Sequence, residues 1–404
     1  MRGVCLDGEK LVQMGFQSRV DPQNHAIGWL QRGYSFLVGG TVIRFPRIWM
    51  SFGECRVKAF RARFRLFRFA RVVCIAGSVF ISFHAPEGRA ETLTGQPISS
   101  AAEESGLKDE PIEPIPRTVE LDARKVALGE MLFNDPRLSH DDTVACVSCH
   151  DLAKGGTDQL SRSVGIGGAL GDVNSPTVFN SGFNFVQFWD GRAATLEDQI
   201  DGPVHNPKEL ASDWPEILAK LRQDRDTVSA FDRIYGDGIQ SANVKDAIAT
   251  YERSLITPNS RFDRFLRGDD GAITDEERAG YELFKSYRCV ACHQGVNIGG
   301  NMFVKIGILG DYAADRGGVT KADYGRFNVT GRERDRQVFK VPSLRNVALT
   351  APYFHDGSAE TLKAAVIVMG IYQLGRPFSK NDVKRIVAFL RTLTGEYQGT
   401  PLWP

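Results

Sequence analysis

The chain has 404 residues, of which 42% are hydrophobic and 25% charged, a balance typical of soluble globular proteins and not of disordered or fibrous ones. This length is sufficient for two domains. The net charge of +1 conceals an uneven distribution, because residues 1–90 carry 14 Lys and Arg against 5 Asp and Glu, whereas residues 91–404 carry 36 against 44. The two parts therefore have different roles.

Residues 61–90 have the order of features of a secretory signal peptide. Five arginines precede the apolar run VVCIAGSVFISF, and small residues follow it up to Ala90. This order predicts export to the periplasm, with cleavage near Ala90. The run is too short to cross a bilayer comfortably, so we expect no membrane span in the mature chain. Residues 1–60 show no clear periodicity, and we expect residues 1–90 to be an N-terminal extension plus the signal peptide.

The first helix predicted in the mature chain leads to a cysteine pair. Residues 121–133 carry an apolar stripe of leucines at helical spacing, and the motif CVSCH follows with Cys146, Cys149 and His150. Two thiols at this spacing can add to the two vinyl groups of one haem, while the adjacent histidine turns its imidazole to the iron. The motif therefore predicts covalent haem attachment.

Two further helices are predicted before the second cysteine pair. Residues 241–255 carry an apolar stripe, with Ser241 as the expected N-cap. Thr274 and Glu277 form a capping box that opens the next helix. A helix therefore precedes each cysteine pair.

The second pair repeats the first motif as CVACH, with Cys289, Cys292 and His293. A dithiol redox pair, or one zinc ion held by all four cysteines, is the alternative interpretation. After Ala90 no cysteine remains outside the two pairs, and both pairs are followed at once by histidine. This arrangement favours two c-type haems over both alternatives.

The remainder of the chain completes a tandem architecture. Residues 317–337 are polar and contain several glycines, which predicts an exposed loop, and the last helix is predicted to begin at Ser379 and to end at Gly395. No segment shows convincing strand alternation. We predict an all-α fold of two cytochrome c-type haem domains in tandem with long irregular loops. The predicted parts after the signal peptide are an N-terminal tail at 91–118, an N-terminal haem domain at 119–260 and a C-terminal haem domain at 261–404.

Candidate sixth ligands of the two irons are few. The methionines after Ala90 are Met131, Met302 and Met369. Met302 is only nine residues beyond His293 and too near to reach the opposite haem face, and Met131 lies in the apolar stripe of a helix and is interpreted as core. Met369 precedes the last helix and has the position of an axial ligand, with core packing as its alternative. A thioether ligand raises the reduction potential of a haem.

Several motifs between Glu120 and Gly395 together resemble the bacterial dihaem cytochrome c peroxidases. They are LFNDPRLS, CVSCHDLAKGGTD, SPTVFN, QFWDGRAATLEDQIDGP, CVACHQGVNIGG, VPSLRNVALTAPYFHDGSAETL and IVAFLRTLTG. The resemblance implies a low-potential peroxidatic haem in the N-terminal domain and a high-potential His/Met haem in the C-terminal domain. It also implies calcium between them.

The resemblance assigns roles to single residues. Met369 matches the axial methionine, Trp189 matches a tryptophan between the two haems, and Glu209 and Gln199 match a glutamate and a glutamine of the peroxide pocket. Without the resemblance, Glu209 would be interpreted as a solvated carboxylate and Trp189 as core.

The resemblance also implies a calcium site. Asn174, Thr350 and Pro352 match its ligands, the last two through backbone carbonyls, and calcium prefers such oxygen donors. His355 lies in the turn sequence HDG and is interpreted as structural. His205 is interpreted as a surface residue, with the alternative that it folds into the peroxide pocket.

One position departs from the family pattern. The loop SRSVGIGGALG, at residues 161–171, carries Ile166 where many members have a histidine that caps the peroxidatic iron in the oxidised state. An isoleucine has no lone pair to donate. We therefore expect an open or water-bound sixth site, and the resemblance does not imply the reductive activation switch for this chain.

The resemblance implies reduction of hydrogen peroxide to water, with Glu209 as general acid and base and with electrons arriving singly past Trp189. Two alternatives stay open: a methylamine-utilisation-type dihaem enzyme that oxidises a partner protein, and a non-enzymatic dihaem electron carrier. The methylamine-utilisation enzymes also lack the distal histidine, but they have tyrosine where Met369 stands.

The expected partners are hydrogen peroxide and a small electron-donor protein, either a cytochrome c or a cupredoxin. The net charge of −8 over residues 91–404 favours a basic donor. We expect no nucleic-acid partner, and a homodimer is an open possibility.

Overall fold

The computed structural model describes residues 35–38, 41–44 and 107–403. The predicted signal peptide, most of the N-terminal extension and residues 91–106 of the predicted tail lie outside these residues. Within the extension, strands β1 (Ser35–Val38) and β2 (Thr41–Arg44) form an antiparallel pair. They belong to a separate compact unit, Met1–Thr92, whereas Leu93–Pro404 forms the unit that carries both cysteine motifs.

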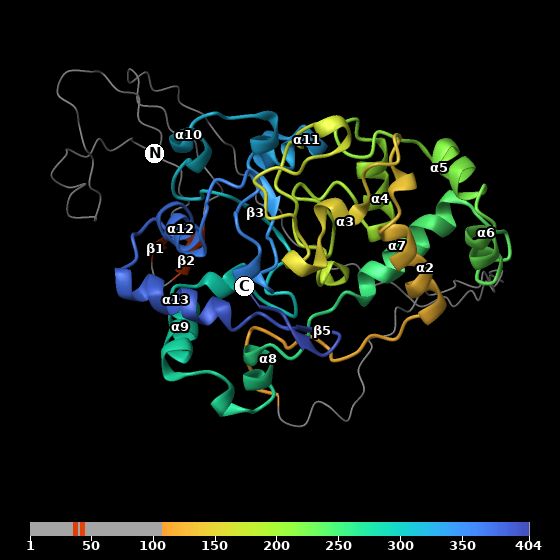
Figure 1. The fold of residues 1–404 in the computed structure, drawn as a ribbon. Coiled ribbons are helices and arrows are strands. Elements are labelled where there is room, and N and C mark those ends of the chain that lie inside the picture. Colours follow the sequence, from red (N-terminus) through yellow and green to blue (C-terminus); the bar gives the residue numbers. More distant parts are fainter. Residues whose placement is uncertain (1–34, 39–40, 45–106, 404) are drawn as a thin grey trace, which may run out of the picture. The chain divides into compact units, whose positions relative to one another are not determined.

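The larger unit is rich in helices (Figure 1). Its α-helices are α2 (Ala123–Phe133), α3 (Cys146–Cys149), α4 (Leu196–His205), α5 (Trp214–Leu221), α6 (Arg225–Asp232), α7 (Ser241–Ser254), α8 (Arg261–Leu266), α9 (Asp275–Ser286), α10 (Tyr312–Arg316), α11 (Phe327–Thr330), α12 (Leu362–Val368) and α13 (Lys380–Arg391). Within the described part of the chain, no helix is both long and apolar enough for a membrane span.

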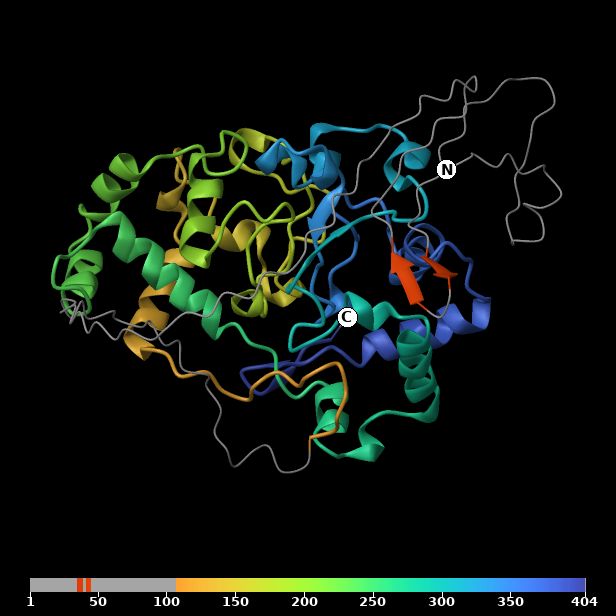
Figure 2. The same ribbon diagram turned by 180° about the vertical axis from the view of Figure 1, so that it is seen from behind.

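The prediction of an all-α fold is wrong in detail, because this unit also contains two short antiparallel strand pairs. Strand β3 (Phe303–Lys305) pairs with β4 (Val338–Lys340), and β5 (Glu396–Tyr397) pairs with β6 (Thr400–Pro401). Two- and three-residue strands are too short to produce a recognisable alternation in the sequence. The β3–β4 pair lies between the two groups of helices (Figure 1, Figure 2).

Local capping signals fix most helix starts. The predicted capping box of Thr274 and Glu277 opens α9, and Ser379 accepts a hydrogen bond from Asp382 N at the start of α13. The predicted N-cap Ser241 is instead the first residue of α7, after Gln240. Helix α13 ends at Arg391, earlier than predicted, so Gly395 lies beyond it.

Two hydrophobic cores repeat one packing arrangement. In the first core α2 lies against α7, and in the second α9 lies against α13 (Figure 1). A Cβ added to Gly129 would lie 2.0 Å from the Ala247 carbonyl oxygen, and one added to Gly280 would lie 2.0 Å from the Arg385 carbonyl oxygen. In each half, a glycine therefore lets the helix before the cysteine motif lie directly on the closing helix.

A segment from each end of the larger unit packs against the core of the opposite half. Ile112, from the predicted N-terminal tail, is buried in the second core, whereas Tyr397 and Leu402, near the C-terminus, pack against the first core. Residues 93–404 accordingly cluster as one compact unit. The predicted division near Ser260 remains a prediction.

Candidate haem sites

Helix α3 presents the first CxxCH motif on one short turn. His150 N donates to the Cys146 carbonyl oxygen at 3.0 Å, which brings the thiols of Cys146 and Cys149 and the imidazole together. His150 Nδ1 lies 3.4 Å from the Gly156 carbonyl oxygen and, facing an acceptor, carries the proton. Burial lowers the pKa of His150, so the ring is neutral with a free lone pair on Nε2. This is the form that binds a metal.

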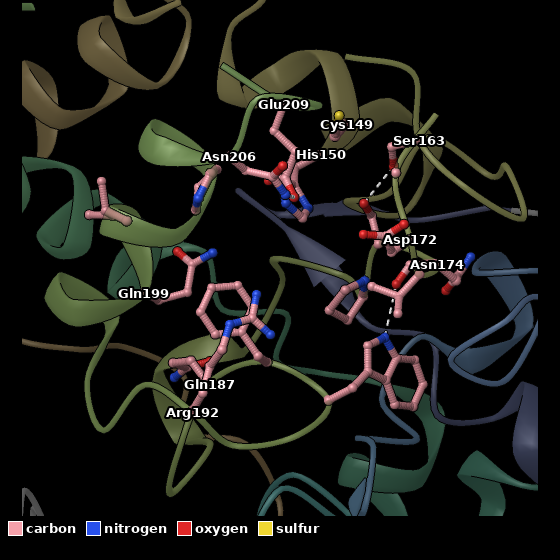
Figure 3. Close-up of a pocket in the computed structure, with 18 of the residues that line it drawn as sticks. Cys149, His150, Ser163, Asp172, Asn174, Gln187, Arg192, Gln199, Asn206 and Glu209 are labelled. Atoms are coloured by element: carbon pink, nitrogen blue, oxygen red, sulfur yellow. Dashed lines mark hydrogen bonds between the residues drawn. The ribbon is translucent and has the colours of Figure 1, made fainter. Parts of the chain in front are cut away.

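A cavity of about 790 Å³ opens in front of this turn (Figure 3). Cys146, Cys149 and His150 line it, together with apolar side chains of the first core that include Leu196 and Ile200. Pockets of this size and mostly apolar lining suit cofactors. Two free thiols and a neutral imidazole on such a wall fit one c-type haem.

The candidate peroxide residues line the same cavity. Gln199 extends from α4, and Asn206 Nδ2 donates to Glu209 Oε1 at 2.6 Å (Figure 3). Burial raises the pKa of the Glu209 carboxyl, although the hydrogen bond from Asn206 opposes this shift. His205 is exposed at the end of α4 and its Nδ1 lies 2.8 Å from the Asp201 carbonyl oxygen. His205 is therefore a surface residue that does not line this cavity.

The loop that carries Ile166 is attached to the Glu209 segment. Ile166 N donates to the Glu209 carbonyl oxygen at 3.0 Å, and a Cβ added to Gly165 would lie 2.0 Å from the Lys208 carbonyl oxygen. The Ile166 side chain packs against the first core. The cavity wall includes Arg162, Ser163 and Gly171 of the loop and Asp172 directly after it, and none of these is a histidine.

Trp189 connects the cavity with the C-terminal half. Its indole Nε1 donates to the Asn174 carbonyl oxygen at 2.9 Å, and its own carbonyl oxygen accepts from Lys340 N at 2.8 Å. Asn174 N donates to the His355 carbonyl oxygen at 2.8 Å, which brings Asn174 close to the segment that carries Thr350 and Pro352. The roles of Trp189 and of the three calcium-ligand candidates remain predictions.

An ion-pair cluster within residues 316–356 was not predicted. Asp323 is only 2% exposed and accepts hydrogen bonds from Arg316 Nη2 at 2.8 Å and His355 Nε2 at 2.9 Å. Although burial alone would raise it, these bonds and one from Thr320 hold the pKa of Asp323 at about 2. The prediction that 317–337 is an exposed loop is therefore wrong around Asp323, because its carboxylate pairs with the Arg316 guanidinium and accepts a hydrogen bond from His355 inside the fold.

Arg316 also pairs with Asp356. Carboxylate and imidazole atoms of Asp323, His355 and Asp356 lie within 4.8 Å of one another, close enough for a metal ion. The guanidinium group of Arg316 already compensates both carboxylates, so an ion-pair network explains this cluster.

Two buried charged side chains of the cavity were also missed. Glu252, on α7, is buried, its Oε2 has no hydrogen-bond partner among the described residues, and burial raises its pKa to about 8. Lys340, the last residue of β4, is 6% exposed, and burial lowers its pKa to about 8. In the sequence both resemble ordinary surface charges.

The second CxxCH motif has a more apolar surrounding. His293 N donates to the Cys289 carbonyl oxygen at 3.0 Å, and His293 Nδ1 lies 3.2 Å from the Ile298 carbonyl oxygen. Burial lowers the pKa of His293 to about 4, and the Phe284 ring lies 6.3 Å from its imidazole. Cys289 packs against the second core, and Cys292 is also free. This motif therefore also offers two thiols and a neutral imidazole.

Met369 begins a π-helical turn, Met369–Gln373, directly after α12. Such turns are rare and often lie at functional sites. Its ligand role remains a prediction. Met131, interpreted from the sequence as core, is 39% exposed, because α2 turns Leu128, Gly129 and Leu132 to the core instead.

Comparisons with known proteins identify dihaem cytochrome c peroxidases as relatives of this chain. The family model described as di-haem cytochrome c peroxidase matches residues 123–271. Cytochrome c551 peroxidase of Nitrosomonas europaea is 46% identical over 292 residues, covering 71% of this chain and 85% of the relative. Cytochrome c peroxidase Ccp of Escherichia coli is 52% identical over 291 residues, covering 72% of this chain, which spans only 62% of that relative.

More distant relatives include proteins of a second activity. Methylamine utilization protein MauG of Methylorubrum extorquens is 32% identical over 299 residues, covering 70% of this chain and 82% of the relative. A crystal structure of a MauG-like protein associated with microbial copper homeostasis superposes with a TM-score of 0.63 at 28% identity, covering 72% of this chain and 94% of that one.

Proposed function

Because the chain belongs to the dihaem cytochrome c peroxidase family, with two c-type haems, we propose that it reduces hydrogen peroxide to water with electrons from a small redox protein. One observation carries the proposal: a half-buried carboxyl group with a raised pKa, Glu209, shares a cavity with the first CxxCH motif. Peroxide reduction needs such a group, because hydroxide is a poor leaving group without a proton.

The two sites would hold haems with different roles. Cys146, Cys149 and His150 would hold the first haem, and Cys289, Cys292, His293 and Met369 would hold the second. When bound, the first haem supplies the redox chemistry of the peroxide bond and the second delivers electrons to it.

Glu209 moves the proton in this proposal. Its carboxylate takes a proton from the peroxide oxygen nearer the first haem and gives it to the oxygen that leaves as water. Asn206 holds Glu209 Oε1 through the 2.6 Å hydrogen bond, which fixes the carboxyl group in the cavity. Gln199 offers an amide to the same space. Two electrons and two protons per peroxide then give two waters.

The finer elements of the proposal concern the connection between the sites. Trp189 lies on the electron path, supported by its hydrogen bonds to both halves of the chain. Asn174, Thr350 and Pro352 hold calcium beside it, supported by the contact of Asn174 with the His355 segment. The place of action is the periplasm, to which the predicted signal peptide would deliver the chain.

An apolar surface near Met369 suits a small electron donor. Leu309 is 63% exposed and its N–H donates to the Tyr372 carbonyl oxygen at 3.0 Å, within the turn that Met369 begins. Ile308 and Ile371 are also exposed. A cytochrome c or a cupredoxin, each with an apolar face around its metal site, would dock here.

The test uses the exported holoprotein with both haems attached. Rapid mixing with hydrogen peroxide and a reduced small c-type cytochrome should oxidise two cytochromes per peroxide, and the Cys146→Ala/Cys149→Ala variant should not turn over. A wild-type protein that oxidises tryptophans of a partner protein, but not the cytochrome, would favour the methylamine-utilisation activity that the relatives of about 30% identity suggest. Absence of both reactions would favour an electron carrier.

A further inference from the structure

We propose that Lys340 binds a propionate of the haem attached at Cys146 and Cys149, and so anchors the first haem to the C-terminal half of the chain. The inference rests on the proposed first haem site. It adds an anchoring residue from outside the half that carries the attachment motif.

The first argument is the isolation of the Lys340 side chain. It lines the cavity, the residue is 6% exposed, and within the described part of the chain its ammonium group has neither an ion-pair nor a hydrogen-bond partner. Lysines are rarely this buried unless they are paired. The side chain is therefore available to pair with an anion that enters the cavity.

The carboxylates of the cavity have other partners. Asp190 pairs with Arg192 at 3.1 Å and Asp172 with Lys208 at 2.5 Å. Glu209 accepts from Asn206, and Glu252 is mostly protonated near neutral pH because burial raises its pKa to about 8. None of them is in ion-pair contact with Lys340.

The other cations of the cavity wall are less suitable for a buried anion. Arg192 pairs with Asp190, and its guanidinium carbon lies 3.4 Å from the centroid of the Phe188 ring. Arg162 and Lys321 are exposed. Lys340 is thus the buried cation available to a carboxylate that enters the cavity.

Haem carries two propionates on the edge of the porphyrin away from the vinyl groups. Helix α3 carries the thiols that would bond the vinyl groups, whereas Lys340 reaches the same cavity from β4, in the C-terminal half of the chain. Lys340 N donates to the Trp189 carbonyl oxygen at 2.8 Å, so its backbone is fixed beside the proposed electron path. A propionate bound there would connect haem, strand β4 and Trp189.

The test is a redox titration of the fully loaded Lys340→Met protein. Removing a cation beside a propionate favours the oxidised iron, so the potential of the first haem should fall by on the order of tenfold in the reduction equilibrium, about 59 mV for one electron. The second haem should keep its potential. Lys321→Met is the matched control, because Lys321 lines the same cavity but is exposed, and it should shift neither haem.

The Lys340→Arg variant should restore the wild-type potential, which a purely structural role of the lysine would not require. If Lys340→Met fails to retain haem, Lys340→Gln serves for the same titration. An unshifted first-haem potential in a loaded neutral variant would overturn the inference and leave the proposed function intact. Absence of haem from Cys146 and Cys149 in the wild-type protein would instead overturn the proposed site itself.

Discussion

The two cysteine motifs differ at only one of five positions, yet the side chains around them differ greatly. Around the first motif, a cavity is lined by three ionisable groups, the buried Glu252 and Lys340 and the half-buried Glu209. Around the second, Phe284 lies near His293, and Cys289 packs against an apolar core. Haem attachment thus depends on a five-residue motif that both halves share. The reactivity of each haem site depends instead on the side chains that other parts of the fold place around the motif.

The helical frame behind both motifs is also shared. Gly129 and Gly280 each allow a close contact between the helix before the motif and the closing helix of the same half. Two of the three ionisable groups, Glu209 and Lys340, lie outside this pair of helices, and Glu252 lies on the closing helix α7. Glu209 follows α4 and Lys340 ends β4, so these two side chains can differ between the halves without a change in the helix packing behind the motif.

Removal of one cysteine pair should have the largest effect on the difference between the two haem sites. The Cys146→Ala/Cys149→Ala variant should keep one haem and lose peroxide reduction completely, because its reactive cavity has no attached cofactor. The Cys289→Ala/Cys292→Ala variant should keep the first haem and lose turnover with the reduced cytochrome. Haem-to-protein ratio and intact mass measure attachment. A preparation with zinc and no haem would contradict both assignments.

Glu209→Gln should separate proton chemistry from haem attachment. Haem content should be unchanged, but the step that cleaves peroxide should slow by about 10² to 10⁴, the usual contribution of a general acid and base. Stopped-flow absorbance of the holoprotein measures this rate. Asp172→Asn is the matched control, because this carboxylate lines the same cavity but is exposed and paired with Lys208. A loss below threefold would remove Glu209 from the mechanism.

Ile166 permits a test of whether the first site is open when oxidised. The wild-type protein should show a high-spin ferric signal in electron paramagnetic resonance and should react with peroxide without prior reduction. Ile166→His should convert that signal to low-spin and should slow the reaction of the oxidised protein with peroxide until one electron enters the second haem.

His205→Ala is the control for that experiment. The exposed His205 ring is directed to the Asp201 carbonyl oxygen, so its removal should leave the spin state unchanged. Two low-spin signals in the wild-type protein would show that another donor closes the site.

Structural features that depend only on neighbouring residues along the chain could be predicted from the sequence. The capping residues Thr274 and Ser379 need only neighbours along the chain, and both were predicted correctly. The sequence also carries a local signal of the helix contacts: GEMLF and GYELF, at Gly129 and Gly280, repeat the pattern G-x-x-L-F in the two helices before the motifs. That pattern marks the glycine contacts of both cores.

Features with a distant cause could not be predicted in this way. Asp323 is buried because Arg316 and His355 compensate its charge, and Lys340 is buried because β4 pairs with a strand more than thirty residues earlier. Burial of a charged side chain depends on such tertiary partners, which the pattern of a single segment does not contain.

The last expected effect is on stability and concerns Glu252. The pKa of its carboxyl group rises from an ordinary 4.5 to about 8 in the folded protein because the group is buried. Between these values the unfolded chain has released a proton that the folded chain retains, so the free energy of unfolding should fall as pH rises, by at most about 1.4 kcal/mol per pH unit. Glu252→Gln cannot titrate and should flatten this dependence between pH 5 and 8.

Chemical denaturation of the holoprotein at both pH values measures the difference in the free energy of unfolding. The control is Glu130→Gln, which replaces an exposed glutamate on α2 and should follow the wild type. Equal slopes for the wild type and Glu252→Gln would mean that Glu252 is ionised in the folded protein and that a cation or a bound group compensates it. In that case a positive charge would lie beside Glu252 in the first site. The difference in ionisable groups between the two motifs would then rest on Glu209 and Lys340 alone.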